Sequence, residues 1–259
     1  MLFVMFLVQL ILPLVLGLVA AVYWRRHGQS IRKGFGFTFH AWSLGDFGAG
    51  LLITFVAMVG IFLVEWLLGG IRVVGMQVNP AAIATALRDI TLGAVTEELL
   101  FRSLLLSGLV VVLGGRKWAA VIISAVVFGG VHLANPGASY ISAFGNALGG
   151  IIYGIAFLGG QNIWLPLGLH FSWNFSQGPI LGFPVSGFDF GGLIRQETTG
   201  SALLTGGAYG PEAGLVGMIF RFVIMALVLY YLQRRCHGQG EVKSLTFPIK
   251  VYENPKGNS

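Results

Sequence analysis

The sequence predicts an all-α protein, a polytopic bundle of about seven transmembrane helices (six to eight are possible) around a buried polar pocket. Hydrophobic residues make up 55% of the 259 positions and charged residues only 10%, whereas soluble domains carry about 25% charged residues. The apolar residues also gather in runs long enough to cross about 30 Å of hydrocarbon. This composition excludes a soluble globular domain of the same length.

Seven segments are expected to cross the bilayer as helices. Together they would form one domain over residues 1–243, with a motif-bearing core at about 84–178 and a polar cytoplasmic tail over 244–259. The first run lacks a basic start and is too long for a signal peptide, so we expect it to be a retained span. The connection over 179–212 is expected to be a lid or interfacial loop. The expected spans are 2–24, 48–68, 84–113, 118–134, 139–158, 162–178 and 213–233.

The basic residues predict how the protein is oriented. They concentrate in alternate loops, which would place the N-terminus outside and the C-terminus in the cytoplasm, because short cytoplasmic loops are rich in Lys and Arg. In a bacterium the protein would lie in the cell (inner) membrane. The net charge of +6 is explained by these loops, so we expect a lipid bilayer and no nucleic acid as partner. The loop residues are Arg25, Arg26, Arg32, Lys33, Arg116, Lys117, Arg234, Arg235 and Lys243, against Arg72 and Arg195 on the opposite side.

A group of three charged residues lies within the third expected span, in the sequence Glu97-Glu98-Leu99-Leu100-Phe101-Arg102. A charge at the centre of a bilayer costs roughly 2.5–3.5 kcal/mol. On a helix Glu98 and Arg102 share a face and can neutralise each other, whereas Glu97 is turned about 100° away. A structural salt bridge between helices explains the first two residues. It leaves Glu97 unexplained, and this favours chemistry inside the membrane.

Two further spans carry polar groups of the same kind. His132 ends the fourth span, and His170 and Asn174 lie four residues apart in the sixth, so they share one face. Polar side chains in hydrocarbon turn inward and pair with one another. We therefore expect these residues to converge with Glu97 on one pocket.

These residue types favour hydrolysis with water as the nucleophile. Covalent catalysis lacks an obvious nucleophile, but a carboxylate beside an imidazole can deprotonate water. An imidazole and an amide can donate to a developing oxyanion. Alternatively Glu97, His132 and His170 could bind zinc, although the sequence lacks His-Glu-x-x-His. We expect water activation without a metal or any other cofactor, with zinc kept as the alternative.

In order along the chain, Glu97-Glu98-x-x-x-Arg102, Phe128-x-x-x-His132 and His170-x-x-x-Asn174 resemble the three motifs of the CPBP intramembrane proteases. This family, also called Abi, includes the CAAX prenyl endopeptidases and bacterial proteins linked to bacteriocin processing or self-immunity. The resemblance implies that Glu97 is the base and that His132 holds the water. It also implies that His170 and Asn174 form the oxyanion hole and that Arg102 anchors Glu98. Ser103 departs from the family, which often has glycine after the arginine.

The predicted function is an intramembrane endopeptidase acting on a membrane-attached or lipidated peptide or protein substrate. One alternative is a non-catalytic peptide-binding or bacteriocin-immunity membrane protein that keeps the pocket. A further alternative is a proton-coupled transporter, because buried Glu, His and Arg also form proton relays. The complete set of motif residues and the lack of an internal repeat favour the enzyme.

Overall fold

The computed structural model describes residues 41–237 continuously, together with single positions among residues 11–39. The expected span over 2–24 and the tail over 244–259 lie outside the continuously described part of the chain. The side chain of Cys236 is also outside it.

The described chain is mainly helical, and four of its helices are long and apolar enough to cross a membrane. They are α3 (Ser43–Leu67), the helical stretch Lys117–Ala134, α7 (Tyr140–Gly160) and Leu215–Arg235, the apolar part of α10 (Leu215–His237). These four correspond to the expected spans over 48–68, 118–134, 139–158 and 213–233. The chain is therefore an integral membrane protein. Its expected total of about seven spans is not confirmed.

The two other expected spans within residues 41–237 are helical but do not qualify by length and composition. The segment predicted at 84–113 is a continuous helical run of α4 (Pro80–Glu98), the π-helix η1 (Leu99–Leu106) and α5 (Ser107–Val112). The segment predicted at 162–178 is α8 (Trp164–Phe175) followed by the π-helix η3 (Ser176–Ile180). Two of the three helical segments that carry the predicted site residues are therefore not candidate spans, whereas the third, Lys117–Ala134 with His132, is one.

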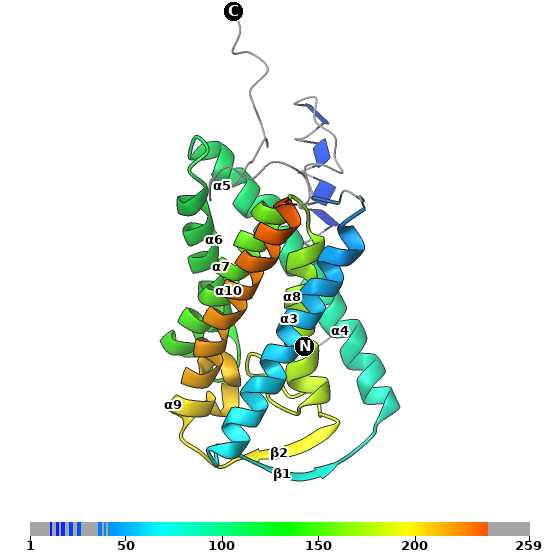
Figure 1. Cartoon of the computed structure of the whole chain (residues 1–259), viewed down its shortest axis with the longest axis vertical. Helices are drawn as coiled ribbons and strands as arrows, with labels where there is room; N and C mark the ends of the chain where they lie inside the picture. Colours follow the sequence, from blue (N-terminus) through cyan, green and yellow to red (C-terminus); the bar gives the residue numbers. More distant parts are fainter. Residues whose placement is uncertain are drawn as a thin grey trace, which may run out of the picture.

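The helices α3, α7, α8 and α10 run side by side, and β1, β2 and α9 (Ala202–Thr205) lie together at one end of the bundle (Figure 1). α8 packs most closely against α3, and α6 (Lys117–Val131) against α7. Glycine permits both of these close helix–helix contacts. A Cβ on Gly168 would stand 2.3 Å from the carbonyl oxygen of Phe47, and one on Gly129 would stand 2.2 Å from that of Ala143. Small residues of this kind let membrane helices come close together.

A two-stranded antiparallel ribbon interrupts the otherwise helical fold, which the all-α prediction missed. β1 (Ile71–Met76) pairs with β2 (Ile194–Thr198), with Ile71 opposite Thr198 and Met76 opposite Ile194. A bulge falls between Val73 and Gly75. β2 lies inside the segment expected to be a loop over 179–212. The rest of that segment holds three short helices, α9, η4 (Gly207–Tyr209) and η5 (Pro211–Ala213).

Candidate active site

Glu98 and Arg102 form the charged centre of the site. Glu98 ends α4, and Arg102 follows in the π-helix η1. The Nε atom of Arg102 lies 3.3 Å from Oε2 of Glu98, and both side chains are almost completely buried. The expected ion pair is therefore formed. Short π-helical turns inside α-helices are frequent at functional sites. The sequence Leu99–Leu106 did not predict a π-helix.

His170 is fixed by Glu98 from one side and by an aromatic ring from the other. Its Nδ1 lies 2.8 Å from Oε1 of Glu98, and its ring stacks on Tyr153 at 4.9 Å between centroids. The guanidinium of Arg102 lies over the rings of Tyr153 and Phe128 at 5.0 and 4.5 Å. These cation–π contacts stabilise the two nitrogens of Arg102 that have no hydrogen-bond partner.

His132 follows the last turn of α6, in the 3-10 turn η2 (His132–Ala134). Its Nδ1 lies 2.7 Å from the carbonyl oxygen of Phe128, one turn earlier. Because a carbonyl oxygen can only accept, Nδ1 carries the proton of a neutral ring and Nε2 carries the lone pair. The backbone of α6 therefore sets both the orientation and the tautomer of His132.

Glu97 faces the space between the two imidazoles. Its Oε2 lies 3.7 Å from Nε2 of His170 and 3.9 Å from Nε2 of His132. Both separations are too long for direct hydrogen bonds, and this buried oxygen has no hydrogen-bond partner. A single water molecule between these three atoms would satisfy them. The expected convergence of Glu97 with His132 and His170 is confirmed.

A cavity of about 1010 Å³ opens onto this cluster, lined by Glu97, His132, His170 and Asn174 among others. Asn174 follows His170 by one turn of α8, as its spacing predicted. Glu98 and Arg102 lie behind the cavity wall. The six predicted residues thus separate into four that border the cavity and two that are buried behind it.

The same cavity has a second polar wall that sequence reasoning did not single out. Asn146 of α7 donates a hydrogen bond to the hydroxyl of Tyr209 at 2.8 Å, and Gln177 donates to Oε2 of Glu212 at 2.7 Å. Burial raises the pKa of Tyr209, and the charge of Glu212 raises it further, so the phenol stays neutral at pH 7. Arg221 of α10 also borders the cavity. The signal for Arg221 was present in the sequence, as a charge within an apolar span.

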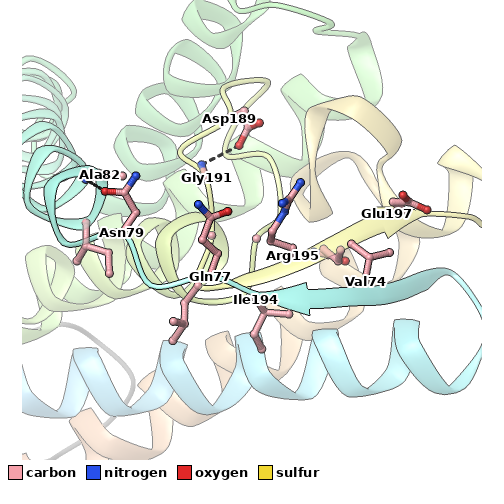
Figure 2. Close-up of a pocket in the computed structure, with 14 residues that line it drawn as sticks. Val74, Gln77, Asn79, Ala82, Asp189, Gly191, Ile194, Arg195 and Glu197 are labelled. Atoms are coloured by element: carbon pink, nitrogen blue, oxygen red, sulfur yellow. Dashed lines mark hydrogen bonds between the residues drawn. The ribbon is translucent and has the colours of Figure 1, made fainter.

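A smaller cavity of about 400 Å³ lies against the ribbon, between β2 and the start of α4 (Figure 2). Two of the polar side chains drawn there bind backbone amides. Asn79 caps α4 by accepting from the amide of Ala82, and Asp189 accepts from the amide of Gly191 (Figure 2). None of the six predicted residues lines this cavity. The larger cavity is therefore the candidate active site.

The described part of the chain contains no group of three or more His, Cys, Asp or Glu side chains arranged to hold a metal ion. This holds for the set considered for zinc, which is Glu97, His132 and His170. The mechanism proposed below uses these three residues without a metal ion.

Residues 79–176 match the family model described as type II CAAX prenyl endopeptidase, Rce1-like. The match agrees with the resemblance that the three motifs carry. The Rce1-like segment contains all six predicted site residues and ends before β2 and α10. No curated protein and no solved structure matches the chain. The match supports a membrane protease at a coarse level and favours neither the immunity nor the transporter alternative.

Proposed function

We propose that the protein is an intramembrane endopeptidase that hydrolyses a peptide bond in a membrane-attached or lipidated substrate. The observation that carries this proposal is the unpartnered Oε2 of Glu97, which faces Nε2 of both His132 and His170. A buried carboxylate oxygen without a partner is costly. Beside two imidazoles such an oxygen can hold and deprotonate a water molecule.

In this mechanism the water donates one hydrogen bond to Glu97 and the other to Nε2 of His132. The tautomer fixed by the carbonyl of Phe128 leaves that nitrogen free to accept. As the water oxygen bonds to the carbonyl carbon of the substrate, its proton passes to Glu97. The C–N bond of the tetrahedral intermediate then breaks, and Glu97 returns the proton to the leaving nitrogen.

His170 and Asn174 are proposed to bind the oxyanion of the intermediate. Nδ1 of His170 is already engaged by the carboxylate of Glu98, so Nε2 can donate only when the ring is an imidazolium. Glu98 lies 2.8 Å away and supports that charge. Each oxyanion donor contributes about 10²–10³ in kcat.

This protonation scheme also balances the charges of the buried cluster. The carboxylates of Glu97 and Glu98 offset the cations of His170 and Arg102, so the cluster has no net charge. Neutrality matters because an uncompensated charge in the interior costs several kcal/mol. Glu98 and Arg102 touch neither water nor substrate in this scheme, so they act as positioning residues.

The substrate is proposed to be a membrane-attached peptide or protein. Lipidated CAAX peptides are the candidates that the family description suggests. The cavity is bordered by α4 residues from Thr85 to Glu97 and by the end of α6, and α4 packs mainly against α8 and η1. We therefore propose that the substrate enters sideways from the bilayer, between α4 and α6.

The same topology supports an inside C-terminus. The connection between α5 and α6, which ends with Arg116 just before Lys117 begins α6, lies at the end of the bundle where α10 finishes with Arg234 and Arg235 (Figure 1). The ribbon with Arg72 and Arg195 lies at the other end. By the positive-inside rule the first end is cytoplasmic.

The test is mass spectrometry of peptides released from candidate membrane substrates in proteoliposomes. Purified wild-type protein is expected to release peptides that Glu97→Gln and His132→Ala variants do not. Ser172→Ala is the matched control, because Ser172 lies on α8 but its hydroxyl bonds the carbonyl of Leu51 on α3. Peptide release that survives Glu97→Gln would refute the mechanism. Peptide binding without release by the wild type would instead support the immunity alternative.

A further inference from the structure

Arg221 is a buried charge outside the segment that matches the family. It lies in the apolar part of α10, and only 2% of its surface is exposed. A charge at such a position is costly and usually marks a binding site or ion pathway. The mechanism proposed above does not use it.

The guanidinium of Arg221 is not neutralised by an ion pair. Within residues 41–237 no carboxylate oxygen lies within 4.0 Å of it. Its centre lies 4.2 Å from the ring centroid of Trp173, and its Nε has no hydrogen-bond partner. The nearby buried carboxylate of Glu212 is instead bound by Gln177, Ser186 and Trp173. Arg221 therefore has a cation–π contact and an unused donor.

Arg221 packs against α7, the helix whose Tyr153 contacts the catalytic cluster. The guanidinium lies against the backbone at Gly149, where an added Cβ would stand 2.1 Å from its NH1 nitrogen. Tyr153 is one turn further along α7, about 6 Å away, and its ring stacks on His170. Arg221 borders the same cavity as Glu97. A few residues of extended peptide, at about 3.3 Å each, cover such a separation.

We propose that Arg221 is an anion-binding subsite of the catalytic cavity that takes a carboxylate of the substrate, a few residues from the cleaved bond. This inference rests on the proposed function. The planar guanidinium matches a carboxylate in two parallel hydrogen bonds, and a cavity shielded from bulk water strengthens such a pair. The carboxylate is either an acidic side chain or the C-terminus of the peptide.

The test uses N-palmitoylated decapeptide libraries in liposomes, prepared in three forms. The first has a free C-terminal carboxylate, the second an amidated C-terminus with one internal Glu, and the third an amidated C-terminus with no acidic residue. Wild-type protein is expected to show a kcat/KM at least tenfold higher for one of the two acidic forms than for the neutral form. The preferred form identifies the source of the carboxylate.

Three variants assign this preference to Arg221. Arg221→Gln is expected to reduce the ratio between acidic and neutral peptides to about one, and Arg221→Lys to an intermediate value. Gly149→Ala keeps the charge but displaces the guanidinium, so it is expected to reduce the ratio as well. Arg234→Gln is the control, because Arg234 is an exposed arginine of the same helix, and it should keep the wild-type ratio. A wild-type ratio near one, or an unchanged ratio in Arg221→Gln, would overturn the inference.

Binding measurements separate this inference from the proposed function. The Glu97→Gln protein is titrated with the same three peptide forms, each carrying a fluorophore, and the Kd is measured. If no peptide is cleaved by the wild type, the proposed function fails, while a tenfold Kd preference that depends on Arg221 still supports the subsite. If cleavage occurs and neither Kd nor kcat/KM depends on the carboxylate, the subsite alone fails.

Discussion

Glu98 accepts a hydrogen bond from Nδ1 of His170 at 2.8 Å while its other oxygen lies 3.3 Å from Nε of Arg102. The second acidic residue of the motif is therefore shared between an ion pair within its own helical run and an imidazole on α8. This arrangement ties the π-helix to the helix that carries His170 and Asn174.

Glu98→Gln is expected to lower both stability and activity. The substitution leaves Arg102 as an uncompensated buried charge, which costs about 3–5 kcal/mol. It also removes the charge that supports the imidazolium of His170, so kcat should fall by about 10²-fold or more. Thermal unfolding in detergent and peptide cleavage in proteoliposomes measure the two effects.

Adding Arg102→Met to Glu98→Gln separates these effects. The double variant should recover much of the lost stability, because no unpaired charge remains in the core, but it should not recover activity. A double variant as unstable as the single one would show that the pair does not act as a unit. Recovery of activity would show that Glu98 is not needed to position His170.

Glu97→Gln is expected to behave in the opposite way. Oε2 of Glu97 has no hydrogen-bond partner, so removal of its charge should leave the unfolding temperature unchanged or slightly higher, as is common for functional residues that are held at a cost. Cleavage should fall by about 10²–10⁴-fold, the usual contribution of a general base. A large loss of stability would instead assign Glu97 a structural role.

Metal removal tests how water is activated. In the proposed mechanism Glu97 and His132 act directly, so wild-type protein dialysed against 1,10-phenanthroline should keep its activity. Its zinc content by mass spectrometry should stay well below one ion per chain. Loss of activity on chelation, restored by zinc and paralleled by loss of zinc in His132→Ala, would establish the alternative in which Glu97, His132 and His170 bind the metal.

The sequence predicts this site well where the signal is local or chemical. The spacing of four residues predicted that Glu98 pairs with Arg102 and that Asn174 shares a face with His170. The cost of polar groups in hydrocarbon predicted that Glu97 meets both imidazoles. These predictions succeed because helix geometry and burial leave few other solutions.

The features that the sequence did not reveal depend on contacts between distant segments. β1 and β2 are separated by more than a hundred residues, so neither forms a recognisable hairpin. Arg221 can be recognised as a charge within an apolar span, but only the packing of α10 on α7 at Gly149 places it at the cavity. The bond between Glu98 and His170 likewise follows from how α4 packs on α8.

Substrate is expected to reach Glu97 from the side, between α4 and α6. Gly93 of α4 and Val131 of α6 border the cavity on the two sides of the proposed entrance. A photo-crosslinking amino acid at either position should capture an N-palmitoylated peptide in liposomes. The same probe at Val126, an exposed apolar residue of α6 that does not line the cavity, is the control for general contact with lipid-anchored peptides. Capture confined to probes in the loop over 181–193, with none at Gly93 or Val131, would contradict sideways entry and would place the entrance on the aqueous side, beside the ribbon.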